Sequence, residues 1–113
     1  MTLYRRMHFF AAALAILVAA GSLMAAGNAE TGKVFYMKRC AACHGPEGEG
    51  KAAIAKSLKV ELRHLGSKEV QAKPDKELAK DTTGGIGKMK PEKGLTEQQV
   101  ADLIAFLRSL AKK

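Results

Sequence analysis

The most regular pattern of apolar and polar positions lies near the C-terminal end of the chain. Apolar residues recur there at steps of three and four, the spacing that places side chains on one face of a helix. They are Val100, Leu103, Ile104, Leu107 and Leu110. Thr96 and Gln99 stand just before this run at the two positions of a capping box. The sequence therefore predicts a helix from about residue 96 to the end of the chain.

A second helix is predicted over residues 31–41, where apolar positions fall on two adjoining helical stripes. It stops at Gly45 and Pro46, which begin a turn-rich loop. A short helix is expected over residues 52–58, and Ser67 is placed to cap another short turn through residue 72. Pro74 suits the first turn of a helix reaching about residue 80, with Leu78 facing inward.

Glycine and proline interrupt the chain between residues 82 and 91, at Gly84, Gly85, Gly87 and Pro91. This composition predicts a tight irregular loop that presents Ile86, Lys88 and Met89. No segment alternates between apolar and polar residues for long enough to indicate a strand. The fold class is therefore predicted to be all-α.

The N-terminal segment, residues 1–29, differs from the rest of the chain. Arg5 and Arg6 precede an uncharged run from Phe9 to Ala26, and small residues follow it. This is the layout of a secretory signal peptide, and the run also reaches the lower limit for a membrane span, so an uncleaved anchor is the alternative. Cleavage is placed after Ala29, with Ala26 or Gly27 as the other positions. The predicted domains are a signal peptide, residues 1–29, and one folded domain, residues 30–113.

Composition supports one small folded domain. The 113 residues are 47% hydrophobic and 27% charged, with a net charge of +8. Two of the basic residues lie in the signal, so the folded domain remains basic. A chain this short draws only about 3–5 kcal/mol of stability from its core. An exported chain can add a disulfide, a metal or a covalent cofactor. No aromatic and basic motif indicates nucleic-acid binding, and a monomer is expected.

The reactive residues cluster in the string Cys40-Ala41-Ala42-Cys43-His44. Positions three and four apart share one helical face, so both thiols and the imidazole can meet one flat ligand. Two such thiols can bond covalently to the edge of a haem while the following histidine binds its iron, as in c-type haem attachment.

Three other interpretations of this string remain open. A zinc site has only Cys40, Cys43, His44 and His64 as good ligands, in unusual spacing. A thioredoxin-like pair expects a βαβ context, and a disulfide across two residues closes too small a loop to stabilise much. Haem c is therefore the favoured cofactor.

A haem held by His44 has a second axial position. Met89 is the candidate for it, because its thioether lies in the glycine-rich loop, whose backbone can approach the ring closely. Met37 lies three residues before Cys40 and is tied to the His44 side of the ring. His64 is the rival ligand.

At these residues the sequence resembles small class I cytochromes c of the bacterial periplasm. The resemblance rests on Gly32 and Tyr36 ahead of the Cys40–His44 motif, on the Gly84–Pro91 loop with Lys88 and Met89, and on residues 102–107. It implies three to five helices around one covalent haem, with Gly32 and Tyr36 crossing Leu103 and Phe106. It also implies His44 and Met89 as axial ligands and one-electron transfer through an exposed haem edge.

Two features depart from the family pattern. Lys90 separates Met89 from Pro91, whereas these two residue types are often adjacent in the family. No proline occupies the Ala52-Ala53 stretch, where relatives carry one whose carbonyl accepts the Nδ1 proton of the haem histidine. The acceptor for His44 Nδ1 is therefore unassigned, and that contact tunes the iron.

With both axial positions filled, the expected function is electron shuttling rather than catalysis. The expected partner is an acidic-faced oxidase, reductase or dehydrogenase, steered by a set of basic residues near the haem edge. These are Lys33, Lys38, Arg39, Lys88, Lys90 and Lys93. The alternatives are a haem enzyme or ligand sensor in which Met89 dissociates, and a membrane-tethered electron-transfer module if the N-terminal segment is uncleaved.

Overall fold

Helix-capping residues define the first and last helices of the domain. The computed structural model describes residues 26–112, so the predicted signal up to residue 25 lies outside the described residues. Helix α1 (Ala29–Arg39) begins behind Asn28, whose side chain accepts the Thr31 N–H. Helix α6 (Glu97–Ser109) begins with the predicted Thr96 and Gln99 capping box. Both caps satisfy amide groups that a helix leaves unpaired at its start.

Four shorter helices lie between them: α2 (Ala41–His44), α3 (Ala52–Leu58), α4 (Lys68–Gln71) and α5 (Asp75–Gly84). The predicted helix at residues 52–58, the Ser67 cap and the inward position of Leu78 are confirmed. The part of the chain described contains no strand, and the all-α class is confirmed.

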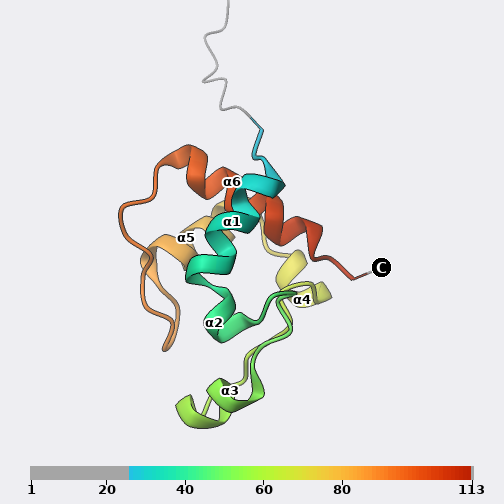
Figure 1. Cartoon of the computed structure of the whole chain (residues 1–113), viewed down its shortest axis with the longest axis vertical. Coiled ribbons are helices and arrows are strands. Elements are labelled where there is room, and N and C mark those ends of the chain that lie inside the picture. Colours follow the sequence, from blue (N-terminus) through green and yellow to red (C-terminus); the bar gives the residue numbers. More distant parts are fainter. Residues whose placement is uncertain (1–25, 113) are drawn as a thin grey trace, which may run out of the picture.

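Helices α1 and α6 cross closely, as the resemblance implied (Figure 1). A Cβ atom on Gly32 would overlap the main-chain carbonyl of Asp102, so only glycine permits this approach. One turn later the rings of Tyr36 and Phe106 pack with centroids 4.8 Å apart. Tyr36 and Leu103 are the most deeply buried large side chains described, so the crossing is the centre of the core.

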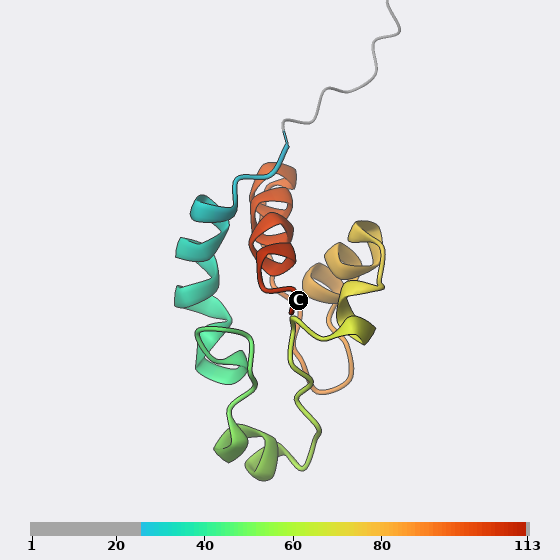
Figure 2. The same ribbon diagram turned by 90° about the vertical axis from the view of Figure 1, so that its right-hand side faces the viewer.

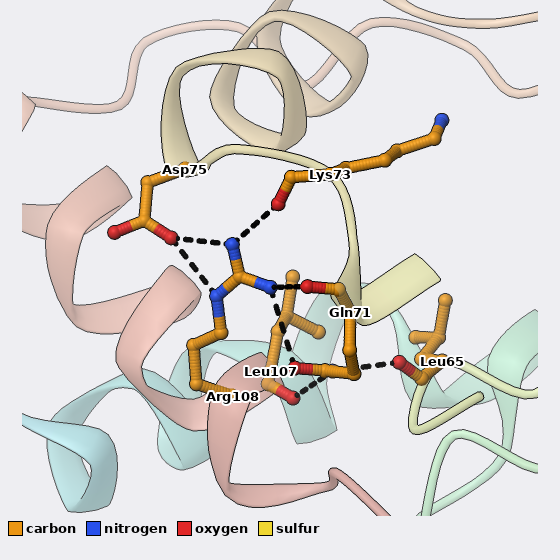
Figure 3. A network of polar contacts seen from close by, with 6 residues as sticks. All are labelled: Leu65, Gln71, Lys73, Asp75, Leu107 and Arg108. Atoms are coloured by element: carbon orange, nitrogen blue, oxygen red, sulfur yellow. Dashed lines mark hydrogen bonds and ion pairs between the residues drawn. The ribbon is translucent and has the colours of Figure 1, made fainter. Parts of the chain in front are cut away.

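Helices α4 and α5 are joined to α6 by one arginine (Figure 3). The Arg108 guanidinium donates to the main-chain carbonyls of Gln71, at 2.8 Å, and Lys73, at 2.6 Å. It also donates to the Asp75 carboxylate from two nitrogens, at 2.9 and 2.7 Å. The Gln71 side chain donates in turn to the carbonyls of Leu65 and Leu107. Arg108 therefore fixes the turn between α4 and α5 against α6.

Several details of the structure differ from the predictions. Helix α1 begins two residues earlier than predicted, because Asn28 caps it. Helix α5 runs to Gly84, so the irregular loop starts after residue 84 and not at residue 82 as predicted. The hydroxyls of Thr82 and Thr83 donate to main-chain carbonyls one turn earlier in the helix. The number of helices in the described residues is six rather than three to five, since the turn around Cys43 forms a helix of its own.

Candidate functional site

The two thiols and the imidazole lie on one helical turn. Cys40 is both the last cap of α1 and the first cap of α2, which contains Cys43 and ends at His44. The main-chain nitrogens of Cys43 and His44 both donate to the Cys40 carbonyl, at 3.2 and 2.9 Å. Both cysteines are free thiols, Cys40 half-buried and Cys43 exposed. The turn therefore presents three reactive groups without a disulfide between them.

Burial shifts the pKa values of Cys40 and His44. It raises the pKa of the Cys40 thiol to about 11, with a smaller contribution from the Glu92 carboxylate. Burial also lowers the pKa of His44, so its ring is neutral at pH 7 and keeps a nitrogen lone pair for a metal. Nδ1 of His44 is buried and has no hydrogen-bond partner among residues 26–112. The ring nitrogen left for a metal is then Nε2.

The chain that follows His44 is held by main-chain hydrogen bonds. The Gly50 N–H donates to the His44 carbonyl at 2.7 Å, and the Lys51 N–H donates to the Cys43 carbonyl at 2.9 Å. The buried Tyr36 hydroxyl donates to the Gly45 carbonyl at 2.6 Å. Burial and the nearby Cys40 and Glu49 raise the pKa of Tyr36, so this hydroxyl stays a donor. The helix crossing thereby fixes the position of the His44 turn.

We expect Tyr36→Phe to lower the free energy of unfolding by about 1 kcal/mol, because Gly45 is buried and loses a hydrogen bond. The loss is limited because the Gly45 carbonyl also accepts the Gly48 N–H, at 3.2 Å. Urea unfolding of the cofactor-loaded protein, followed by circular dichroism, measures the difference. Unchanged stability would show that the hydroxyl contributes nothing to the position of this turn.

Met89 belongs to the loop that follows α5. Figure 2 shows this loop on the α5 side of the molecule, across from α2. The loop is closed by paired hydrogen bonds between Ile86 and Met89, at 3.2 and 2.9 Å. Gly85 has a φ of 80°, and a Cβ atom there would lie 2.9 Å from the Met89 carbonyl. Glycine is required at this position both for the backbone angle and for the space.

The loop is tied to the rest of the molecule on both sides of Met89. The Glu92 N–H donates to the Thr82 carbonyl at 2.9 Å, and the Lys88 ammonium donates to the Leu58 carbonyl at the end of α3. The Glu92 carboxylate also lies near enough to the Cys40 thiol to raise its pKa. The loop is thus connected with α3 and α5 and returns toward the Cys40 turn.

The apolar residues around this region lack a protein core of their own. Helices α3 and α4 contain no buried residue. Ile54, Val60 and Leu62 are only half-buried, and Leu58 is 40% exposed. When several large apolar side chains occur in one short segment, they are normally covered by other apolar atoms. A flat apolar ring attached at Cys40 and Cys43 fits this surface as well as the donor groups.

Comparison with protein-family models identifies the family of the chain, since the cytochrome c model matches residues 29–111. The chain belongs to the cytochrome c family. A comparison with curated proteins finds no match. The cytochrome c family carries covalently bound haem c, and Cys40 and Cys43 fit its attachment motif. The cytochrome is thus a haem c protein of the electron-carrier type.

The structure also places the other candidate residues of the cytochrome. His64 is half-buried, and its Nδ1 accepts a hydrogen bond from the Gly66 main-chain N–H at 2.9 Å, so this nitrogen already has a partner. Among residues 26–112, no group of three or more His, Cys, Asp or Glu side chains is arranged to hold a metal ion. The six predicted docking residues are all exposed. None of the helices between residues 26 and 112 combines the length and hydropathy of a membrane span.

Sequence reasoning missed the contacts of Asn28 with α6 and the Arg108 network. Asn28 carried a readable signal, since asparagine is a favoured N-cap residue and Glu30 follows in the first turn. The sequence contained no signal for the contacts of Arg108, because the carbonyl groups that it binds lie far earlier in the chain, in the turn between α4 and α5. Position in the sequence alone gives no reason to pair them.

Proposed function

We propose that this cytochrome is a periplasmic one-electron carrier whose haem iron is bound by His44 on one side and Met89 on the other. The observation that carries the proposal is the arrangement of the site. One helical turn presents Cys40, Cys43 and His44, and the loop that contains Met89 lies across from that turn, on the α5 side. A thioether ligand raises the reduction potential relative to a second imidazole.

The protein's own residues hold this geometry constant. When bound, haem c supplies the iron that accepts and releases the electron. Tyr36 and the Gly50 N–H fix the His44 turn, and Gly85 and Lys88 fix the loop on the Met89 side. The half-buried side chains of residues 54–65 exclude water from the ring. Fixed ligands and little water leave few atoms to rearrange when the iron changes charge, which favours rapid electron transfer.

Replacing Met89 by alanine tests the ligand assignment. We expect Met89→Ala to abolish the far-red absorption band of methionine-bound ferric haem while the haem stays covalently attached. Absorption spectra in both redox states, with a denaturing gel stained for haem, measure the two properties. Met37→Ala is the matched control, because Met37 is 45% exposed on α1. Loss of the band in the control, or its survival in Met89→Ala, would contradict the assignment.

The same variants separate a carrier from a haem enzyme or sensor. If Met89 stays bound in the native state, carbon monoxide will not bind the reduced protein at neutral pH but will bind reduced Met89→Ala. The ties from Thr82 and Leu58 to the loop support the carrier. Rapid carbon monoxide binding by the unmodified protein would favour the enzyme or sensor.

The partner we propose is a redox protein with an acidic face. Lys33, Lys38 and Arg39 are exposed on α1, and Lys88, Lys90 and Lys93 are exposed around the Met89 loop. Two large exposed apolar side chains accompany these lysines. Ile86 lies in the loop and is 48% exposed, and the main-chain carbonyl of Leu58 accepts a hydrogen bond from Lys88. At the Met89 loop, exposed apolar side chains with lysines in the same segment fit a transient interface in which charge guides the encounter.

We expect the double variant Lys90→Glu and Lys93→Glu to slow association with an acidic redox partner by about tenfold at low salt. The difference should shrink as ionic strength rises, since exposed charges are screened. Stopped-flow mixing at several salt concentrations measures the rates. The double variant Lys68→Glu and Lys112→Glu makes the same change of net charge on α4 and after α6. Equal slowing in both variants would indicate an effect of net charge rather than a docking face.

A further inference from the structure

We infer that signal processing leaves Gly27 and Asn28 on the mature protein, because both residues form part of the contact between α1 and α6. The inference rests on the proposed export of the chain and is independent of the haem ligands. It selects among the three cleavage positions that the sequence offers, after Ala26, Gly27 or Ala29. The residues that decide it are Asn28, Gly27 and Asp102.

Asn28 makes three hydrogen bonds that hold the start of α1. Its side-chain oxygen accepts the Thr31 N–H at 3.0 Å, and its carbonyl accepts the Gly32 N–H at 2.9 Å. Its own N–H donates to the Asp102 carboxylate of α6 at 2.8 Å. Asp102 is buried, and the Gln98 amide is its other hydrogen-bond donor. Asn28 therefore both caps one helix and satisfies a buried carboxylate on the other.

Gly27 lies directly on α6. A Cβ atom at Gly27 would overlap the main-chain carbonyl of Ala101 and would lie 3.0 Å from the Ala105 side chain. Only a residue without a side chain can follow this path, which is a requirement of the folded domain and not of a segment that is removed.

Each later cleavage position removes part of this contact. Hydrolysis after Ala29 would remove Gly27, Asn28 and the first residue of α1, and would place a new ammonium group on Glu30. A positive charge there is unfavourable, since the start of a helix carries partial positive charge. Hydrolysis after Gly27 would leave an ammonium group on Asn28 that can still donate to Asp102, but it would remove the close packing of Gly27 on Ala101.

Cleavage between Ala26 and Gly27 preserves all of these contacts. A signal peptidase would use one water molecule to hydrolyse that peptide bond, leaving a carboxylate on Ala26 and an amino group on Gly27. The cytochrome c match also begins at residue 29, so the family domain includes a residue that cleavage after Ala29 would remove.

Intact-mass spectrometry and N-terminal sequencing of the exported, haem-loaded protein test the inference. The full-length chain is expressed in cells that export it and attach haem. The expected mass is that of a processed chain that still contains Gly27 and Asn28. A mature chain that begins at Asn28, Ala29 or Glu30 would overturn the inference, and so would an unprocessed chain.

Two variants test the structural role of Asn28 in the same protein. We expect Asn28→Ala to lower the melting temperature by about 4–8 °C through loss of the cap, and Asn28→Ser to retain most of it. Neither change should alter the haem absorption spectrum, so the result is separable from failure of the ligand assignment. A melting temperature unchanged in Asn28→Ala would overturn the inference.

Discussion

Replacement of Gly32 by alanine is expected to destabilise the domain by about 3 kcal/mol, near the upper end of the cost of overpacking. The added methyl group would overlap the Asp102 carbonyl, so α1 and α6 must move apart. That movement separates the Tyr36 and Phe106 rings and opens the centre of the core. Because a domain of this size draws only about 3–5 kcal/mol from its core, a loss of this size leaves little stability beyond that provided by haem.

Urea unfolding of the haem-loaded protein, followed by circular dichroism, measures this effect. Gly84→Ala is the matched control, since Gly84 also lies in a helix and no atom lies within 4 Å of a Cβ built there. Alanine has the higher helix propensity, so this control should be neutral or slightly stabilising. Equal destabilisation in the two variants would show that the close helix crossing is not the cause.

Replacement of Arg108 by methionine is expected to cost about 2 kcal/mol, through the loss of charged hydrogen bonds to two main-chain carbonyls. Methionine keeps an apolar stem of similar length, so packing changes little. Arg108→Lys should be nearly as costly, because a single ammonium group does not reproduce the planar fork that reaches Gln71, Lys73 and Asp75 together. Thermal unfolding of the haem-loaded variants checks both values.

The ion pair with Asp75 is the smaller part of this network. The Asp75 side chain is 69% exposed, so Asp75→Asn should cost less than about 1 kcal/mol. Should Asp75→Asn prove as destabilising as Arg108→Met, the carboxylate and not the carbonyls would be the important partner.

Local signals were sufficient to predict most of the helices. The periodic run from Val100 and the capping box predicted the start of α6, and Ser67 and Pro74 marked the starts of α4 and α5. The end of α5 was wrong because the hydroxyls of Thr82 and Thr83 bond within the helix, which residue composition does not reveal. The start of α1 was missed because Asn28 was assigned to the predicted signal peptide.

The site was predictable where its chemistry is encoded in adjacent residues. Cys40, Cys43 and His44 need only one helical turn to meet, so their spacing predicts their geometry. The position of Met89 depends on the path of a loop. The sequence showed only that the glycines of this loop allow its backbone to approach a haem closely. The contacts from Tyr36 to Gly45 and from Lys88 to Leu58 depend on the folded arrangement and have no sequence pattern.

The lack of buried residues in α3 and α4 bears on the order of events in biogenesis. A polypeptide whose apolar segments find no partner in its own side chains cannot complete its interior alone. A covalently bound porphyrin would complete that interior, and Cys43 is exposed for its attachment. We therefore expect attachment of the cofactor and completion of the fold to be coupled in this protein.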